Sequence, residues 1–184
     1  TVNDTTSLDW GDWDGDGDLD LAVGNFEQAN LIYRNDGTTF TLAQTLPLTD
    51  ATNSVAWGDW NGDGDLDLAV GNESENNLVY DNNGTSLTTP AAWQSTTTYF
   101  TTALDWGDWD GDGDLDLAVA NFFDPSHVFE NTGGALSNSP VWTSDLFTGF
   151  DPGSTDVAWA DWDNDGDLDL AVANELCLLY TSDA

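Results

Sequence analysis

The stretch LDWGDWDGDGDLDLAVGN, from Leu8 to Asn25, occurs three more times in nearly the same letters. The other copies run from Val55 to Asn72, from Leu104 to Asn121 and from Val157 to Asn174. A repeat with a period of about 50 residues is typical of supersecondary units that stack, because no such unit buries its apolar face alone. The sequence therefore predicts a single repeat array over residues 1–184.

Aspartates stand at alternate positions around a glycine within this stretch, as in Asp12, Asp14, Asp16, Gly17 and Asp18. Hard oxygen ligands at this spacing, wrapped around a sharp glycine turn, suit calcium. Two carboxylates about 5 Å apart repel each other by roughly 3 kcal/mol at an effective dielectric constant of about 20. Each loop contains several such pairs, so a divalent cation in every loop is the simplest remedy.

The pattern that follows the aspartates separates this loop from an EF-hand. An EF-hand needs a bidentate glutamate at its twelfth position, and counting from Asp12 that residue is Val23. Leu19, Leu21 and Val23 alternate with smaller or acidic residues, and a period of two indicates a strand. We therefore expect the aspartates in a hairpin turn between two strands.

All four copies resemble the repeats of the FG-GAP/VCBS (integrin-alpha-like) family through the segment D-W-D-G-D-G-D-L-D-L-A-V-G-N. Members of that family are β-propellers that bind calcium in a D-x-D-x-D-G-x-x-D hairpin loop. The resemblance implies that the side chains at loop positions 1, 3, 5 and 9 hold the ion and that position 7 gives its backbone carbonyl. About four calcium ions are implied, one per repeat loop.

The implied ligands follow from matching each copy to that loop. The side-chain ligands are Asp12, Asp14, Asp16, Asp20, Asp59, Asn61, Asp63, Asp67, Asp108, Asp110, Asp112, Asp116, Asp161, Asp163, Asp165 and Asp169. The carbonyl ligands are those of Asp18, Asp65, Asp114 and Asp167. Asn61 departs from aspartate but keeps an oxygen ligand, so its loop is expected to bind calcium more weakly.

The chain is expected to be all-β, a β-propeller of four-stranded antiparallel blades with about four repeats. The approximate blades are residues 7–53, 54–102, 103–154 and 155–184. The first blade is expected to have strands at Leu8–Trp13, Leu19–Gly24, LIY before Arg34, and Thr39–Leu46. The later fourth strands are expected at 87–93 and 136–142, and large residues should pack against Ala and Gly of the neighbouring blade.

The fourth copy departs from this pattern. Its hairpin, NELCLLY, is interpreted as two residues shorter than the others, and its last strand is missing. An unpaired edge strand is a ready site for strand addition. Copies of the chain are therefore expected to join through the incomplete fourth blade into a larger ring or a filament.

Charge excludes several classes of partner. The formal net charge is -34, and Arg34 is the only basic residue. Without a cationic surface, binding to nucleic acid or to anionic membranes is not expected, and no run of about 18 apolar residues suggests membrane insertion. Weak, clustered calcium loops suit the calcium concentration outside cells. We therefore expect an extracellular protein, secreted or on the cell surface, with glycosylation sequons at Asn3, Asn72 and Asn83.

The tryptophans repeat with the blades, which favours core packing over a ligand site. Eight of the ten stand at two fixed repeat positions: Trp10, Trp57, Trp106 and Trp159, and Trp13, Trp60, Trp109 and Trp162. The irregular loops Phe122–Ser126 and Phe147–Pro152 are better places for a ligand. His127, at a position held by leucine in two repeats, and Cys177 are expected to be packing residues.

No catalytic constellation is recognisable. The chain has no lysine, and no serine has a nearby histidine and an orienting carboxylate in a recognisable motif. General acid–base catalysis needs carboxylates in distinct environments, which repeated calcium ligands do not provide. We expect a structural or adhesive module that self-assembles, rather than an enzyme. A glycan- or protein-binding propeller is the alternative, and a non-catalytic part of a secreted polysaccharide-acting enzyme is a third reading.

Overall fold

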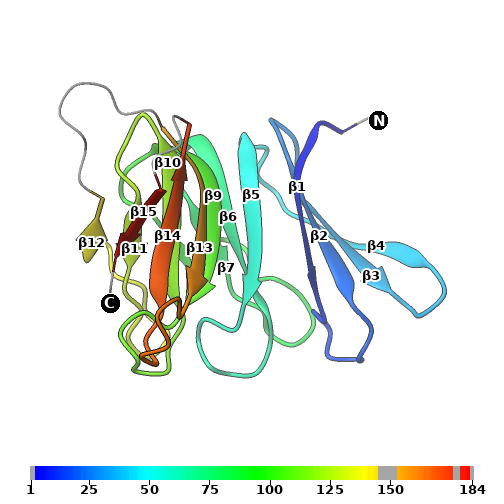
Figure 1. The fold of residues 1–184 in the computed structure, drawn as a ribbon. Coiled ribbons are helices and arrows are strands. Elements are labelled where there is room, and N and C mark those ends of the chain that lie inside the picture. Colours follow the sequence, from blue (N-terminus) through cyan, green and yellow to red (C-terminus); the bar gives the residue numbers. More distant parts are fainter. Residues whose placement is uncertain (1–2, 145–152, 176–178, 183–184) are drawn as a thin grey trace.

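The computed structural model describes residues 3–144, 153–175 and 179–182. The described strands form antiparallel sheets that stand side by side like the blades of a fan (Figure 1). Blade 1 contains β1 (Thr5–Gly11), β2 (Asp20–Asn25), β3 (Leu31–Asn35) and β4 (Phe40–Thr45). Blade 2 contains β5 (Thr52–Gly58), β6 (Asp67–Glu75), β7 (Leu78–Tyr80) and β8 (Trp93–Gln94). Blade 3 contains β9 (Tyr99–Gly107), β10 (Asp116–Phe122), β11 (His127–Phe129) and β12 (Trp142–Thr143), and blade 4 contains β13 (Ser154–Ala160), β14 (Asp169–Asn174) and β15 (Leu179–Ser182).

This all-β, propeller-like architecture confirms the predicted fold class. Within each blade the strands pair in chain order, and the first strands β1, β5, β9 and β13 lie next to one another. Blades 2 and 3 are also joined edge to edge, because Glu73 and Glu75 of β6 pair with Phe100 and Tyr99 of β9. In the part of the chain that the structure describes, no helix has the length and hydrophobicity needed to cross a bilayer.

Several strand boundaries differ from the predicted ones. The first strand was predicted at Leu8–Trp13, but β1 begins at Thr5 and ends at Gly11. It ends early because the N–H of Trp13 is used inside the loop, by the carbonyl of Gly11 and the carboxylate of Asp20. In blades 2 and 3 the fourth strands shrink to two residues each, after Pro90 and Pro140. Proline donates no ladder hydrogen bond, which shortens a strand.

The hairpin of blade 4 has the same length as the others, so the prediction of a hairpin two residues shorter is wrong. Val172 pairs with Tyr180, as Val23 pairs with Leu31 in blade 1. The triplet LLY therefore sits in a different register from LIY. Ala173 pairs with Leu179, which places Leu179 at the register position of Asn30.

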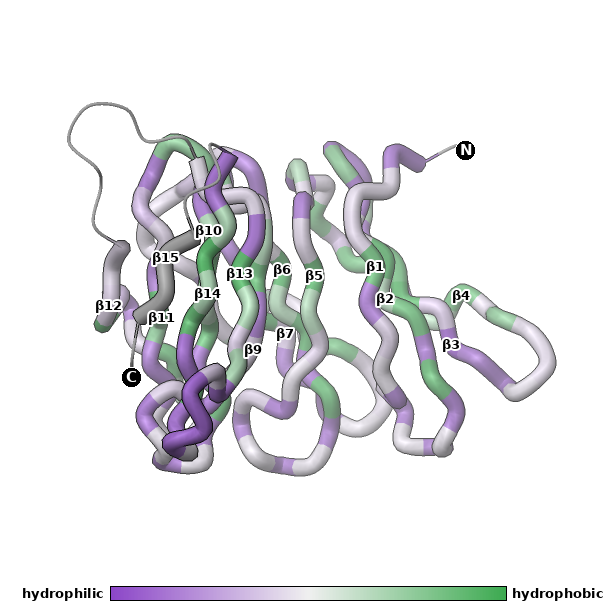
Figure 2. Tube along the Cα trace, viewed as in Figure 1, coloured by the Kyte–Doolittle hydropathy of each residue, from purple (hydrophilic) through white to green (hydrophobic). Residues whose placement is uncertain are grey.

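The hydrophobic cores lie between blades. The core between blades 1 and 2 contains Ala22 and Ile32 of the first sheet and Val55, Leu68 and Tyr80 of the second, and Gly11 and Gly24 lie against Trp57 and Val55. Two further cores repeat this arrangement between blades 2 and 3 and between blades 3 and 4. Figure 2 shows the same division, with apolar residues along the strands and polar residues in the loops below them. The prediction that large side chains pack against Ala and Gly is confirmed.

The predicted core role of the tryptophans holds only where a neighbouring blade is present. Trp13 and Trp60 are each 6% exposed, whereas Trp162 at the same repeat position is 67% exposed. Trp10 is 52% exposed, although its equivalents Trp57, Trp106 and Trp159 pack against the cores. The prediction is therefore wrong for Trp10 and Trp162, which lie on the two outer faces of the array.

His127 is buried, as predicted, and its Nδ1 lies 3.2 Å from Oγ1 of Thr143. Its ring centroid lies 4.8 Å from that of Tyr99. Cys177 and the loop Phe147–Pro152 lie outside the described residues.

Candidate metal centres

The aspartate-rich loops connect the first two strands of each blade. Figure 1 shows that these loops all lie at the same end of the array, below the strands. This follows from the register: β1 ends at Gly11 opposite Asp20, and each later blade repeats that pairing.

Three of the loops bring carboxylates close enough to hold one ion. In each, one oxygen atom from each of three aspartates lies within 4.8 Å of the others. The groups are Asp12, Asp14 and Asp20; Asp108, Asp110 and Asp116; and Asp161, Asp163 and Asp169. These are predicted loop positions 1, 3 and 9. Carboxylates at this separation provide the oxygen ligands that calcium prefers.

The aspartates at position 5 are not members of these groups. Oδ1 of Asp16 accepts a hydrogen bond of 2.9 Å from the backbone N–H of Asp18. Asp63, Asp112 and Asp165 make the same contact in their loops. The position-7 side chain of Asp114 accepts from the N–H of Gly133. The predicted metal-binding roles of positions 5 and 7 stay predictions.

The aspartate at position 1 closes the loop and leaves one oxygen atom for an ion. Oδ2 of Asp12 accepts a 3.0 Å hydrogen bond from the N–H of Gly17, whose φ of 94° favours glycine. Oδ1 of Asp12 and Oδ1 of Asp108 are buried and have no hydrogen-bond partner. A buried carboxylate oxygen without a partner is costly, so these two atoms fit a cation.

The aspartate at position 9 anchors the loop to the sheet. Oδ2 of Asp20 accepts from the N–H of Trp13 at 2.9 Å, and Oδ1 accepts from the N–H of Asn35 at 2.7 Å. Asp67 and Asp116 repeat both contacts. Burial raises the pKa of Asp67 to about 7 and that of Asp116 to about 6, despite these hydrogen bonds. A cation beside them would favour the ionised form again.

The second loop differs because its third position is Asn61. The amide nitrogen of Asn61 donates a 2.7 Å hydrogen bond to Asp81 Oδ1, and its Oδ1 accepts from the N–H of Asp63 at 2.9 Å. The amide oxygen is therefore shared with the backbone. This agrees with the expectation that the loop binds calcium more weakly, which stays a prediction.

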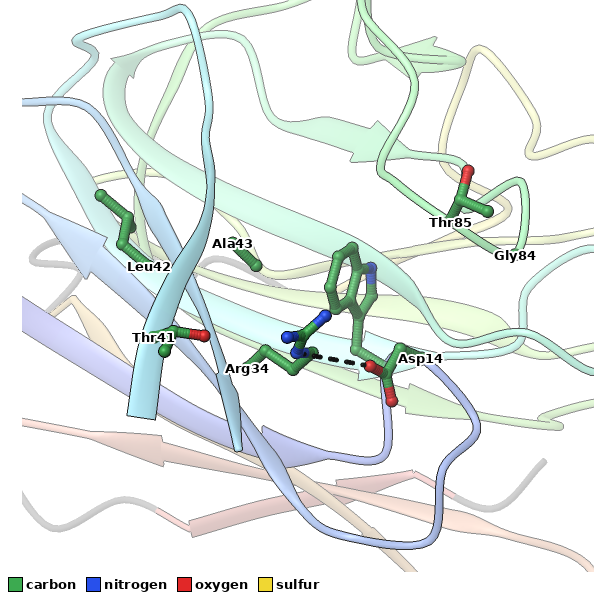
Figure 3. A pocket seen from close by; sticks show the side chains of 8 residues that line it. Asp14, Arg34, Thr41, Leu42, Ala43, Gly84 and Thr85 are labelled. Carbon is green, nitrogen blue, oxygen red and sulfur yellow. Dashed lines mark ion pairs between the residues drawn. The ribbon is translucent and has the colours of Figure 1, made fainter. Parts of the chain in front are cut away.

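Arg34 is a site residue that the sequence reasoning did not place. Figure 3 shows it in a pocket beside loop 1, with Asp14, Leu42 and Thr85 around it. Its Nε lies 3.9 Å from Oδ2 of Asp14 and 2.9 Å from Oδ1 of Asp36. Burial and the carboxylates of Asp20 and Asp16 raise the pKa of Asp14, and Arg34 partly opposes that effect. Arg34 is the single lysine or arginine in the sequence, and this is the signal by which it could have been found.

Asparagines connect loops 1 and 2 to the blades that follow them. Nδ2 of Asn82 donates to the carbonyl of Trp13 at 3.0 Å, and Nδ2 of Asn131 donates to that of Trp60 at 2.5 Å. The sequence shows an asparagine ten residues after the second strand in the first three copies, but the partners of Asn82 and Asn131 lie in another repeat.

A second set of buried contacts lies at the other end of the blades. Oγ1 of Thr52 donates to Asn72 Oδ1 and accepts from Nδ2 of Asn30 in blade 1, both at 2.9 Å. Thr101 repeats this arrangement, and in blade 4 Ser154 accepts from Ser126. Asn72 is fully buried, so a glycan on its sequon would require this contact to open.

Comparison with known proteins agrees with the geometry. No curated protein sequence matches the chain. Two solved structures with a similar fold are those of BBS1N in complex with ARL6DN, soaked with lead and with mercury. Their TM-scores are 0.64 and 0.65 at 16% and 15% identity, and the matches cover 99% of this chain and 51% of each of those chains. The chain thus spans about half the length of those propeller chains, and the likeness is one of fold.

The sequence matches the family described as FG-GAP-like repeat in three overlapping segments, residues 12–70, 59–119 and 108–172. Each segment runs from one aspartate loop to beyond the next, so the match includes the three acidic groups. The resemblance first seen in the aspartate loops is confirmed over most of the sequence. The chain belongs to the FG-GAP-like repeat family.

Proposed function

We propose that this chain is an extracellular structural or adhesive module whose blades are held together by calcium. The observation that carries the proposal is the combination of a partnerless buried oxygen on Asp12 with the hydrogen bond from Asn82 to the carbonyl of the adjacent Trp13. An ion bound at Asp12 would order the loop whose Trp13 carbonyl accepts the hydrogen bond from Asn82 of blade 2. Calcium would therefore stabilise the contact between blades as well as the loop itself.

The same contact recurs one blade further along. Asn131 of blade 3 holds the carbonyl of Trp60 at the start of loop 2. An ion in loop 2 would act on the next interface in the same way. The proposed role is thus distributed along the array and needs no single active site, and we propose no catalytic activity.

Loss of one ligand tests this role. Asp12→Asn and Asp108→Asn should each remove about one ion's share of the calcium-induced stability, roughly 1–3 kcal/mol. Asp4→Asn, an exposed aspartate outside the loops, is the matched control. Calcium-dependent unfolding in urea gives the measurement. Equal calcium dependence in all three variants and the wild type would contradict the proposal.

The extracellular assignment rests on the acidic surface and on loops that suit weak calcium binding. The net charge of -34 leaves a strongly negative surface even when each of four loops holds an ion. Dissociation constants of about 0.1–1 mM are typical of extracellular calcium modules. Calorimetric titration that instead gave constants near 10 nM, about those of cytosolic calcium buffers, would argue against this location.

An exposed aromatic cluster favours glycan or protein binding as a second candidate function. Phe123 is 69% exposed, and its ring centroid lies 4.3 Å from that of Phe122, which in turn lies 5.6 Å from Phe100. Exposed apolar groups that gather in this way mark interaction sites. Phe122 and Phe123 belong to the loop Phe122–Ser126 that sequence analysis selected, whereas Phe100 lies in β9.

A glycan array probed with the calcium-loaded chain tests this second function. Phe123→Ala should abolish any glycan signal, and Phe40→Ala, which removes an exposed ring from blade 1, should leave it unchanged. Binding that survives Phe123→Ala would remove the aromatic cluster as the site.

A further inference from the structure

The two outer faces of the array correspond to the two sides of the interfaces between neighbouring blades. One side is presented by blade 1 and the other by blade 4. Each internal interface joins the large face of one blade, exemplified by Val55 and Trp57, to the small face of the preceding blade, exemplified by Ala22 and Gly11. In blade 1 the large face is open, since Leu8 is 57% exposed whereas its equivalent Val55 is 5% exposed. Blade 4 correspondingly has an open small face.

At each internal interface a tryptophan ring lies against a glycine of the preceding blade. A Cβ atom built on Gly58 would lie 2.6 Å from the ring of Trp106, and one on Gly107 would lie 2.6 Å from the ring of Trp159. At Gly11 the distances are 2.7 Å to Leu66 and 2.9 Å to Trp57. Real Cβ atoms essentially never show contacts under 3.0 Å. The small face must therefore have glycine here, but blade 4 has Ala160.

A second position shows how the interface adapts when glycine is replaced. A Cβ atom on Gly71 would lie 2.8 Å from the methyl group of Thr101, and one on Gly24 would lie 3.0 Å from that of Thr52. Blade 3 has Ala120 at this position, and the facing residue is Ser154, which has no methyl group. Glycine thus faces threonine, and alanine faces serine.

Blade 4 does not match blade 1 at this second position either. It has Ala173, while blade 1 presents threonine at position 5. Thr5 donates to Asn25 as Thr52 does to Asn72. Thr52 also accepts from Asn30 of the preceding blade, but blade 4 has Leu179 at that register position.

We propose that the outer face of blade 1, formed by Leu8, Trp10, Leu19 and Phe40, docks a further repeat blade of defined chemistry. That blade carries glycine at the positions of Gly11 and Gly24 and an amide or hydroxyl side chain at the position of Asn30. The face selects against the chain's own fourth blade, whose Ala160 and Ala173 would overlap Trp10 and Thr5. The proposal is independent of which ligand, if any, the protein binds.

The chain itself supplies the probe. The triple variant A160G, A173G and L179N gives blade 4 the small face that blade 1 requires. Sedimentation velocity in calcium should show that the wild-type chain is monomeric and that the triple variant associates. Its association constant should be about tenfold to a hundredfold higher than that of the wild type, because overpacked contacts have been removed. Adding Trp10→Ala should abolish that association, and adding Val141→Ala, which shortens an exposed apolar side chain in blade 3, should preserve it.

Two results would overturn the proposal. One is a wild-type chain that associates in a Trp10-dependent manner, because the alanines would then be tolerated and copies would join through the fourth blade. The other is a folded triple variant that stays monomeric like the wild type. Calcium-dependent melting shows whether the variant is folded. If it is not, A160G alone removes the larger overlap, and it should give weaker association that Trp10→Ala still abolishes.

Discussion

Removal of calcium should destabilise the protein by an amount that the acidic groups determine. The described residues include three groups of three carboxylates, each able to hold one ion. With dissociation constants of about 0.1–1 mM, an ion at about 10 mM calcium stabilises the folded state by roughly 1.4–2.7 kcal/mol. Three ions give about 4–8 kcal/mol, which is comparable to the whole stability of a domain.

The calcium dependence also counts the ions. Above saturation each ion adds about 1.4 kcal/mol to the free energy of unfolding for every tenfold rise in calcium. Three sites predict a slope of about 4 kcal/mol per decade, and a fourth ion in the Asn61 loop would raise it above about 5 kcal/mol per decade.

Urea unfolding across a calcium series, followed by circular dichroism, measures this slope. Magnesium at equal concentration is the control, and it should restore little stability because it dehydrates reluctantly and demands octahedral geometry. A free energy of unfolding that is the same in EDTA and in calcium would refute the metal assignment. A slope of about 1.4 kcal/mol per decade would mean that only one group binds.

Three substitutions test other parts of the structure. Gly107→Ala should lower the free energy of unfolding by about 1–3 kcal/mol, because its Cβ would lie 2.6 Å from Trp159; an unchanged urea midpoint would contradict the packing argument. Asn61→Asp should destabilise the chain in EDTA, since the donor to Asp81 is lost, yet steepen the calcium slope; a shallower slope would be the contrary result. Burial lowers the pKa of His127 to about 4 from 6.5, so its contribution is present above pH 6.5 and is lost as the pH falls towards 4. His127→Leu should therefore gain about 2 kcal/mol over the wild type between about pH 7.5 and pH 5, and a pH-independent difference would exclude this titration.

The aspartate loops could be predicted because their geometry is local. Gly17 has a positive φ that a glycine allows, and the carboxylate of Asp12 reaches its N–H five residues along the chain. The alternation after each loop likewise predicted β2 and the other second strands. The loops occur four times with the same spacing, so the family resemblance rested on residues that act together within one repeat.

Other features could not be predicted because their partners lie in another repeat. Asn82 grips the carbonyl of Trp13 across a sequence separation of 69 residues. Residues 87–93 looked like a strand, but only Trp93 and Gln94 pair in β8. The hairpin of blade 4 was misread for a similar reason, because LLY resembles LIY while the pairing with β14 sets its register.

The sequence by itself determined the repeat, the loop chemistry and the alternation of each strand, because these depend on residues within a few positions of one another. Only the tertiary structure decided which of the equivalent side chains are buried. Trp13 and Trp162 have similar local surroundings in the sequence, but their exposed fractions are 6% and 67%. The difference arises because apolar burial in a stacked array depends on the sheet that lies against it, and only the first of these tryptophans has one.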